Sequence, residues 1–537
     1  MPRYQITGDR PWFRIWPRGV PKTLDYPSMP LFGLLSRSAA RWPERIAFSL
    51  REQNLTYREL DDLSDRLAAG LHDVGVRAGD RVLLFLPNSL EFVISYYGIL
   101  KAGGTVTTVN PLSRKAELRH ELGDTEATTL ITCSEHHSVA REAQRGTSLN
   151  TIVITDGGTA QGVVHLRHIL DSCPAIPPEF PVRPEEDVAV IVYTGGTTGL
   201  PKGVMLTHLN LIANAMQNAV WFGWDHEDVV IGLLPFYHSW GGCACLNSPV
   251  YCGARVVIVP RFDAAELLGT VERERATVMY GATSMFTSLV NSPEITRHDL
   301  SSLRYVKSGA MPIPVEIRAK WEELTGVRMV LGYGLSEASP ETHNSPPGGV
   351  KPGTIGVPVI DTDARIVDEQ GDEGDLPAGQ PGELIVRGPQ VMKGYLNRPD
   401  DTREALRDGW LYTGDLAMMD EGGYFRILDR IKETIKYKGY TIAPAEVEAV
   451  LYEHLAVREC AVVGKPDMAA GEIPKAYVVL RDGLSATPSE LIEFCGRRIS
   501  PYKRIREVEF IDEIPKTPVG KLLRRVLRDR EKAAQSR

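Results

Sequence analysis

Residues 193–203 read YTGGTTGLPKG and gather glycines, threonine hydroxyls and one lysine into a single loop. The apolar run at 188–192 just before it has the character of a buried parallel strand. Glycines let backbone N–H groups approach phosphate oxygens, hydroxyls add donors, and a lysine neutralises charge. The loop therefore predicts phosphate binding, with a polar surface turn as the alternative. The residues expected to contact phosphates are Thr194, Gly195, Gly196, Thr197, Thr198, Gly199 and Lys202.

Two widespread phosphate motifs do not match this loop. A Walker A loop needs Gly-Lys-Ser/Thr after its spacer residues, whereas Lys202 follows a proline and precedes a glycine. The G-x-G-x-x-G turn of dinucleotide-binding folds is also absent from residues 193–203.

Two further stretches carry groups suited to a nucleotide. Residues 331–337, LGYGLSE, place a flat aromatic ring beside exposed backbone, which suits a purine. Ser336 and Glu337 add a hydroxyl and a hard carboxylate, which suits Mg²⁺; the alternative is an ordinary surface glutamate. In 410–416, WLYTGDL, Asp415 follows a tight turn and could accept both hydroxyls of a ribose, although Gly-Asp turns are common.

Two later stretches contain lysines, the first in a pattern typical of an edge strand and the second on a turn. Residues 428–440, LDRIKETIKYKGY, alternate apolar and basic side chains as an edge strand would. Residues 514–521, IPKTPVGK, place Lys521 on a turn.

Strands and helices must position these groups. Residues 45–200 alternate apolar strand-like runs with helical patterns, and the alternation resumes over 229–279. This favours layered α/β architecture with largely parallel sheets. From about residue 350, short β-like runs between turns predict a small barrel or distorted sheet. After about residue 430 the pattern becomes compact α+β. The clearest expected elements are strands at 82–86, 129–132, 151–154, 255–259 and 475–480, and helices at 91–101, 264–275, 445–454 and 488–499.

Length and composition exclude several classes of protein. A chain of 537 residues exceeds one hydrophobic core, so two or more domains are expected. The net charge of −8 provides no overall electrostatic attraction for nucleic acid, which is itself negatively charged. Residues 1–20 do not resemble a secretory signal, and no stretch offers 18 apolar residues for a membrane span. The seven scattered cysteines lack zinc-site spacing, so we expect reduced thiols in a cytoplasmic protein.

Taken together, the five motifs at 193–203, 331–337, 410–416, 428–440 and 514–521 stand in the order and spacing of the adenylate-forming superfamily. The resemblance runs from about residue 30 to 525. Within that superfamily the chain looks most like the fatty-acyl and medium-chain acyl-CoA ligases. Gly195, where many members have serine, recurs in bacterial long-chain enzymes of that group.

The resemblance implies a large N-terminal domain, 1–429, that binds ATP and the acid, and a small mobile α+β domain, 430–537. It also implies two steps. A carboxylate attacks the α-phosphorus of Mg·ATP to give an acyl-adenylate and pyrophosphate, and the thiol of CoA then attacks the acyl carbon and releases AMP. ATP, Mg²⁺ and coenzyme A are the implied cofactor and co-substrates. A small carboxylic acid is the implied partner, namely a fatty, medium-chain or short branched or hydroxy acid, and a homodimer is compatible with the sequence.

The resemblance assigns roles to the motif residues. Glu337 would ligate Mg²⁺, Ser336 would touch the α-phosphate, and Lys521 would bridge the carboxylate and α-phosphate oxygens. Asp415 would bind the ribose with Arg430 beside it. The adenine would be enclosed by Gly309, Ala310, Gly332, Tyr333 and Gly334.

For the thioester step, the C-terminal domain would rotate about a hinge at Lys432 and exchange Lys521 for the segment holding Lys436, Lys438, Gly439 and Tyr440. Gly439 would let the pantetheine arm pass close to the backbone. The basic run Arg524, Arg525, Arg528, Arg530 and Lys532 fits either the CoA 3′-phosphate or a solvated helix face.

The acyl pocket is expected around 235–242, PFYHSWGG, with His238 near the acyl carbon and a satisfied core histidine as the alternative. Trp240 is bulky and favours a short, medium or branched acid over a long chain. The other pocket residues expected are Gly241, Met279, Tyr280, Gly281, Ser308 and Leu331.

Alternatives to an acid–CoA ligase are a stand-alone enzyme that loads a carrier protein, an aryl-acid–CoA ligase and a luciferase-like oxygenase. A non-catalytic nucleotide-binding regulator is disfavoured because Lys521, Glu337 and Asp415 are all present.

Overall fold

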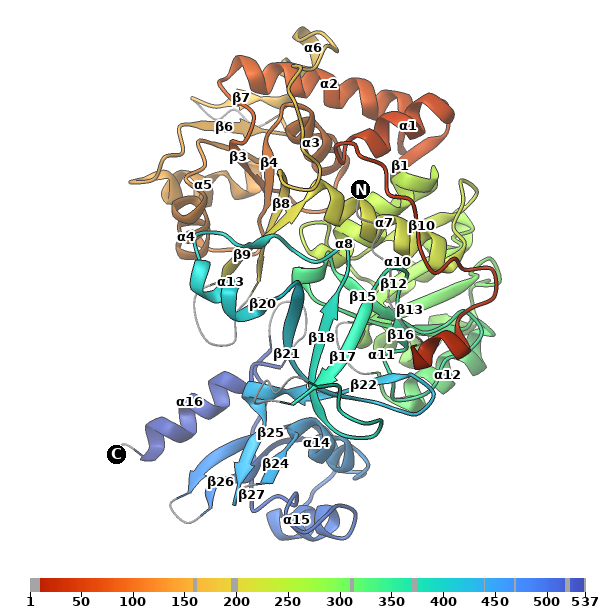
Figure 1. Cartoon of the computed structure of the whole chain (residues 1–537), viewed down its shortest axis with the longest axis vertical. Coiled ribbons are helices and arrows are strands. Elements are labelled where there is room, and N and C mark those ends of the chain that lie inside the picture. Colours follow the sequence, from red (N-terminus) through yellow and green to blue (C-terminus); the bar gives the residue numbers. More distant parts are fainter. Residues whose placement is uncertain are drawn as a thin grey trace. The chain divides into compact units, whose positions relative to one another are not determined.

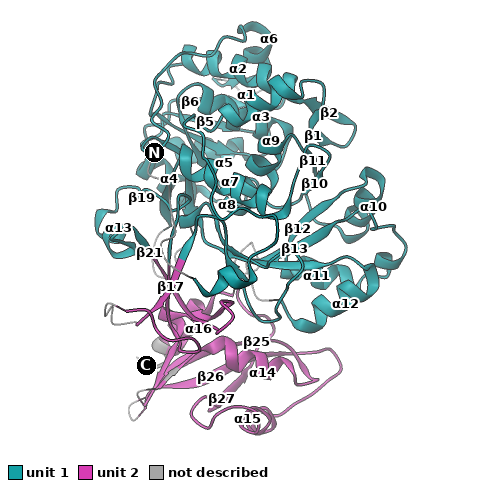
Figure 2. Cartoon of the chain, turned by 45° about the vertical axis from the view of Figure 1, so that its right-hand side comes forward, with its two compact units in different colours: residues 1–195, 200–363, 386–411 teal, residues 196–199, 364–385, 412–537 magenta. Residues whose placement is uncertain are grey.

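The computed structural model describes residues 10–157, 162–194, 201–309, 313–368, 374–438, 440–467, 470–516 and 522–535. Of the predicted site residues, those at 195–199, Ala310, Gly439 and Lys521 lie outside these ranges. The chain forms two compact units, shown in separate colours in Figure 2. The first comprises residues 1–195, 200–363 and 386–411, and the second comprises residues 196–199, 364–385 and 412–537. The boundary expected at residue 430 stays a prediction.

The first unit contains a largely parallel sheet of eight strands (Figure 1). Its strands are β3 (Arg81–Phe85), β4 (Thr105–Thr108), β5 (Thr129–Thr132), β6 (Thr151–Ile154), β7 (Val164–His165), β8 (Val188–Thr194), β9 (Lys202–Thr207) and β19 (Gly394–Tyr395). They lie in the order β19-β9-β8-β4-β3-β5-β6-β7. Strands β3 to β8 pair in parallel, whereas β9 and β19 are antiparallel additions at one edge.

Helices cover this sheet because their apolar faces match its apolar strands. One core joins Leu83 and Leu130 of the sheet to α4 (Lys115–Thr125) and α5 (His137–Gln144). Helix α2 (Tyr57–Asp73) begins at the predicted capping box of Thr56 and Glu59. It packs closely on α3 (Leu90–Lys101), and a Cβ added at Gly98 would lie 2.7 Å from Leu67 Cδ2.

A second sheet of the first unit has nine strands. These are β1 (Ile46–Leu50), β2 (Gln53–Thr56), β10 (Val229–Gly232), β11 (Arg255–Ile258), β12 (Val278–Ala282), β13 (Tyr305–Gly309), β14 (Met329–Gly334), β15 (Glu341–Asn344) and β16 (Val357–Pro358). The order is β16-β15-β14-β13-β12-β10-β11-β1-β2, and the five central pairs from β14 to β1 are parallel. Its associated helices include α7 (His208–Phe222), α8 (Ser239–Gly242), α10 (Ala264–Glu274), α11 (Thr283–Asn291) and α12 (Val315–Thr325).

The β-rich part expected after residue 350 belongs mostly to the second unit. Its five-stranded sheet has the order β17 (Asp363–Val367), β18 (Gly382–Arg387), β21 (Trp410–Met419) and β20 (Leu406–Arg407), and β22 (Phe425–Arg430) also pairs with β21 in antiparallel register.

An α+β layer follows in the second unit. Its sheet order is β24 (Tyr440–Ile442), β23 (Ile435–Tyr437), β26 (Gly471–Leu480) and β25 (Val457–Asp467), and β27 (Glu507–Phe510) also pairs with β26. Helices α14 (Pro444–Tyr452) and α15 (Pro488–Gly496) contribute to one core of this sheet. Leu527 of α16 (Arg524–Gln535) contributes to a second core with Tyr477.

These elements confirm the predicted fold class of α/β layers followed by a smaller α+β part, but one local prediction is wrong. Residues 428–440 do not form one edge strand. They divide into the end of β22, the short 3₁₀ helix η6 (Ile431–Glu433), β23 and the start of β24. Lys438, with φ 49°, lies in the turn that folds β24 back on β23, so β23 lies inside its sheet between β24 and β26.

All seven cysteines are free thiols, as predicted. No helix in the described ranges combines the length and apolar character that a membrane crossing requires.

Candidate active site

The predicted phosphate loop joins two antiparallel strands of the first unit. Thr194 ends β8 and Lys202 begins β9, and these two residues face each other in the ladder. The sequence did not indicate β9, because its short run follows directly on the glycine-rich loop. Both ends of the loop are therefore held by a buried sheet, although residues 195–200 lie outside the described ranges.

Lys202 has two close neighbours on the segment 386–411. Its Nζ lies 2.5 Å from Asp401 Oδ1, and both side chains are about one-third exposed, at 33% and 32%. The same Nζ lies over the ring of Tyr395, 5.1 Å from its centroid. The lysine expected to neutralise phosphate charge therefore contacts both an anionic partner and an aromatic ring.

Strand β14 carries the second motif into the short turn η5 (Ser336–Ala338). Tyr395 donates its hydroxyl to Glu337 Oε1 at 2.8 Å. The hydroxyls of Ser336 and Ser239 are 3.0 Å apart, which joins the 331–337 motif to the 235–242 segment. The structure thus brings together two motifs that are far apart in sequence.

The glycines predicted to enclose the adenine have little space beside their backbone for a side chain. A Cβ at Gly334 would lie 2.1 Å from the carbonyl oxygen of Pro340. A Cβ at Gly332 would lie 2.5 Å from Lys307 Cε. Tyr333 is half-buried, and its ring lies edge-on to the His343 ring with the two ring centroids 5.9 Å apart. The glycines of this motif therefore serve close packing.

The segment predicted to line the acyl pocket forms the start of α8. His238 caps this helix, and its Nδ1 accepts the backbone N–H of Trp240 at 3.2 Å. A neutral ring with Nδ1 as acceptor carries its proton on Nε2. Position 241 requires glycine, because a Cβ at this residue would lie 2.0 Å from the carbonyl oxygen of Pro235.

Trp240 packs against Tyr280, another predicted pocket residue, and lies beside Gly309, a residue predicted to enclose the adenine. Its ring meets that of Tyr280 edge-on at 6.1 Å, and a Cβ at Gly309 would lie 3.0 Å from Trp240 Cη2. Tyr280 is fully buried and donates its hydroxyl to Asn218 Oδ1 at 3.0 Å; burial raises its pKa well above the ordinary value. Tyr280 therefore gives Trp240 a fixed support.

The remaining predicted pocket residues lie in different surroundings. Met279 belongs to a hydrophobic core of the first unit. Gly281 follows Met279 by two residues on β12 and lies close to Phe286. A Cβ added at Gly281 would be 3.1 Å from Cε2 of Phe286. Ser308 Oγ lies 3.5 Å from Thr283 Oγ1, and Leu331 pairs with Ser308 across β13 and β14. Their roles in acid binding stay predictions.

In the second unit, Asp415 and Arg430 face each other across β21 and β22. Arg430 Nε lies 2.8 Å from Asp415 Oδ1, and its Nη1 donates to the carbonyl of Thr413 at 3.0 Å. Asp415 is buried, with 5% of its surface exposed. The sequence prediction that Arg430 lies beside Asp415 is therefore confirmed by position, while ribose binding remains to be tested.

Of the residues predicted for the thioester step, Lys436 lies on β23, Lys438 lies in the turn that follows it, and Tyr440 begins β24. The backbone N–H of Lys436 donates to Glu472 Oε2 at 2.8 Å, and Lys438 Nζ lies over the ring of Tyr437. Tyr440 is 54% exposed and stacks on Tyr502 with centroids 4.6 Å apart.

Helix α16 holds the predicted hinge. Arg528 Nη1 donates to the carbonyl of Lys432 at 2.7 Å. Arg524 is largely buried and pairs with Glu433 and Glu448 at 2.7 and 2.6 Å. Arg525 and Arg530 also have acidic partners within the second unit. These four guanidinium groups therefore have structural contacts, and binding of the CoA 3′-phosphate stays an untested alternative.

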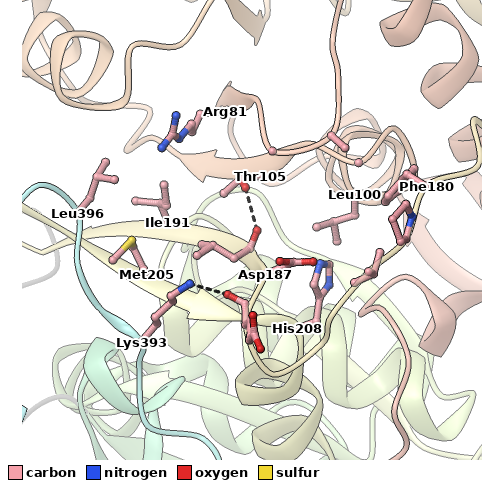
Figure 3. Close-up of a pocket in the computed structure, with 17 residues that line it drawn as sticks. Arg81, Leu100, Thr105, Phe180, Asp187, Ile191, Met205, His208, Lys393 and Leu396 are labelled. Atoms are coloured by element: carbon pink, nitrogen blue, oxygen red, sulfur yellow. Dashed lines mark hydrogen bonds between the residues drawn. The ribbon is translucent and has the colours of Figure 1, made fainter.

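A cavity of about 320 Å³ in the first unit contains none of the predicted site residues (Figure 3). It lies where β3, β4 and β8 begin, at the opposite end of β8 from Thr194. His208 in its wall accepts the backbone N–H of Leu31 at 2.9 Å, and burial lowers the pKa of this histidine to about 4. Lys393 donates to the carbonyl of Glu186 at 2.8 Å. The cavity's polar groups are thus largely engaged by the protein itself.

Tyr395 and Asp401 are the site residues that sequence reasoning missed. They belong to β19 and to α13 (Pro399–Ala405), elements with no chemical motif of their own. Only their spatial approach to Glu337 and Lys202 reveals them.

Comparison with known proteins places this geometry in a family. Residues 35–396 match the model of the AMP-binding enzyme family, and residues 446–521 match the AMP-binding enzyme C-terminal domain. A long-chain-fatty-acid–CoA ligase of Bacillus subtilis is 41% identical, covering 98% of this chain and 99% of the relative. A 4-coumarate–CoA ligase of Oryza sativa is 38% identical, covering 89% of each chain.

Solved structures agree with the sequence relatives. The anthranilate CoA ligase AuaEII in complex with anthranoyl-AMP has a TM-score of 0.88 at 28% identity, covering 96% of this chain and 99% of that one. ATP-bound MatB from Rhodopseudomonas palustris has a TM-score of 0.87 at 27% identity, covering 94% of this chain and 100% of that one. By the match of both family models and the full-length relatives, this chain belongs to the AMP-binding enzyme family.

Proposed function

We propose that this protein is an ATP-dependent, AMP-forming acid–CoA ligase whose acid is a fatty acid. The observation that carries the proposal is the similarity to the Bacillus subtilis long-chain-fatty-acid–CoA ligase, which extends over 98% of this chain at 41% identity. The matched length includes both the phosphate-loop region and the C-terminal region.

In the first step, an oxygen of the acid's carboxylate bonds to the α-phosphorus of ATP, and the bond to the pyrophosphate oxygen breaks. Charge develops on the phosphates, so the residues best placed to help are cations and N–H or O–H donors. We assign the loop of Thr194 and Lys202 to the leaving pyrophosphate and Ser336 to the α-phosphate. Asp415 is assigned to the ribose hydroxyls and Lys521 to the carboxylate and α-phosphate oxygens.

The residues around Glu337 fit a magnesium ion. One carboxylate oxygen of Glu337 accepts the Tyr395 hydroxyl. Mg²⁺ is commonly held by one or two carboxylates together with water and substrate phosphates, so the single carboxylate of Glu337 fits this ion. When bound, Mg²⁺ would supply positive charge to the phosphate oxygens.

In the second step, the sulfur of CoA bonds to the acyl carbon, the bond to AMP breaks, and the thiol proton is released. We assign the CoA approach to Lys436, Lys438, Gly439 and Tyr440. His238, capping α8 with its Nδ1 engaged by the backbone, is assigned to the neighbourhood of the acyl carbon. The free thiols support a cytoplasmic location.

An aryl acid is the second candidate substrate class. The observation in its favour is the 38% identity to the rice 4-coumarate–CoA ligase. The bulk of Trp240, supported by Tyr280, is compatible with a compact pocket.

The test measures pyrophosphate release and thioester formation with saturated fatty acids of increasing length, hydroxylated and branched acids and cinnamic acids, each with and without CoA. We expect thioester formation with fatty acids, ranked by kcat/KM. Highest kcat/KM with cinnamic acids would favour the aryl alternative. Pyrophosphate release without any CoA thioester would contradict a CoA ligase and favour loading of a carrier protein.

A further inference from the structure

Tyr395 touches both halves of the predicted triphosphate site of the first unit. Its hydroxyl donates to Glu337 Oε1 at 2.8 Å, and its ring lies under Lys202 Nζ at 5.1 Å from the centroid. Glu337 is the predicted magnesium ligand and Lys202 is the predicted phosphate lysine. One side chain thus connects the group expected to bind the cation with the group expected to bind the anion.

The backbone fixes Tyr395 in this place. It faces Val204 of β9 across an antiparallel ladder, and its N–H donates to Thr402 Oγ1 at 2.9 Å. Gly394, with φ 148°, allows the chain to pass Thr402 closely, because an added Cβ would lie 2.7 Å from Thr402 Cγ2. Strand β9 starts at Lys202, so the same sheet carries both the tyrosine and the lysine above it.

Asp401 completes the surroundings of Lys202. The 2.5 Å ion pair is about one-third exposed on each side. Such pairs contribute little to stability because water competes for both charges. A triphosphate with several negative charges can displace one exposed carboxylate, whereas the neutral ring of Tyr395 can remain beside the lysine throughout, since cation–π attraction needs no counterion.

We propose that Tyr395 is a positioning residue for Mg·ATP: its hydroxyl orients the Glu337 carboxylate toward the metal, and its ring keeps Lys202 directed at the phosphates. Asp401 is the resting counterion of Lys202 that the triphosphate displaces. The inference rests on the proposed function only in that it takes ATP as the nucleotide, and it is tested by binding rather than by turnover.

The experiment measures equilibrium binding of a fluorescent ATP analogue to the full chain, in EDTA and across a Mg²⁺ titration. The variants are Tyr395→Phe, Tyr395→Leu and Asp401→Asn. The matched control is Tyr26→Phe, which removes another 2.8 Å tyrosine–carboxylate hydrogen bond of the first unit, to Asp361. Melting temperatures of all variants identify any loss of folding.

For Tyr395→Phe we expect about a tenfold rise in the Mg²⁺ concentration at half-maximal binding, since a hydrogen bond to a charged group is lost. Its affinity in EDTA should stay within about twofold of wild type, because the ring under Lys202 remains. Tyr395→Leu should weaken binding in both conditions. Asp401→Asn should tighten binding in EDTA about two- to threefold, because a competing anion is removed. Tyr26→Phe should match wild type in both conditions.

Unchanged Mg²⁺ dependence in Tyr395→Phe, or an equal change in Tyr26→Phe, would overturn the inference. Absence of any Mg²⁺-dependent nucleotide binding by the wild-type chain would overturn it together with the proposed function. If nucleotide binding behaves as expected but no acid yields a CoA thioester, the proposed function alone fails.

Discussion

Lys307 Nζ lies 2.5 Å from Glu341 Oε1 in the interior of the first unit, where 2% and 5% of the two side chains are exposed. Rings of Phe222 and Tyr280 each lie 5.2 Å from the ammonium group. The other carboxylate oxygen accepts from Asn344 at 3.1 Å. Burial lowers the pKa of Lys307 and Glu341 opposes that change. Lys307 lies close to Gly332 of the predicted nucleotide motif, because a Cβ added there would be 2.5 Å from Lys307 Cε.

Replacing one partner of this pair should be costly. We expect Lys307→Met to lower the free energy of unfolding by about 3–5 kcal/mol, because Glu341 is left as an uncompensated buried charge. The measurement is denaturant unfolding followed by tryptophan fluorescence. The double variant Lys307→Met with Glu341→Leu should recover most of the loss, since apolar replacement of both partners leaves no buried charge. A single variant as stable as wild type would contradict this account.

Glu121 should make stability depend on pH. Its carboxyl is buried in α4, its Oε2 has no hydrogen-bond partner among the described residues, and burial, with a smaller effect of Glu117, raises its pKa to about 8. The folded state therefore holds a proton that the unfolded state releases from about pH 4.5 upward. This group's stabilising contribution is fully present below pH 4.5 and is lost as pH rises toward 8.

Glu121→Gln should remove this dependence. The stability difference between variant and wild type should shift in the variant's favour by up to about 1.4 kcal/mol for each pH unit between pH 5 and 8. Unfolding midpoints measured across that interval provide the check. Parallel pH curves for Glu121→Gln and wild type would show that the carboxyl does not titrate in this interval.

Trp240 should influence which acid is accepted. Its ring fills space next to Gly309 and rests on Tyr280. Trp240→Ala removes that volume, so we expect the optimum of kcat/KM to move toward longer chains by several carbons, while the KM for ATP changes little. Assays across a homologous series of fatty acids measure the shift. An unchanged order of preference would place Trp240 outside the acyl pocket.

Lys521 and Gly439 should separate the two half-reactions. Lys521→Ala should abolish adenylation, measured as pyrophosphate release, yet largely spare thioester formation from supplied acyl-adenylate, because the lysine is assigned only to the first step. Gly439→Trp should show the reverse pattern, since a side chain there would block the pantetheine arm. Equal loss of both steps in Lys521→Ala would contradict alternation between two arrangements of the C-terminal part.

Much of the fold could be predicted because its signals are local. Apolar runs located β5 at Thr129–Thr132 and β6 at Thr151–Ile154, and the capping box at Thr56 located the start of α2. The division of 428–440 into several elements was missed. Alternation of apolar and basic side chains fits any short strand, whereas the chain turns back on itself next to Lys438, whose φ is positive.

By itself, the sequence determined which chemical groups the protein offers: a phosphate loop ending at Lys202, a carboxylate at Glu337 and an acid at Asp415. Short stretches of sequence specify both these residue types and the local conformation of the backbone around them. Only the tertiary structure decided which groups meet. Tyr395 joins Glu337 to Lys202, and Lys307 joins Glu341, because sheet pairing brings distant segments together, and no local spacing in the sequence records those long-range contacts.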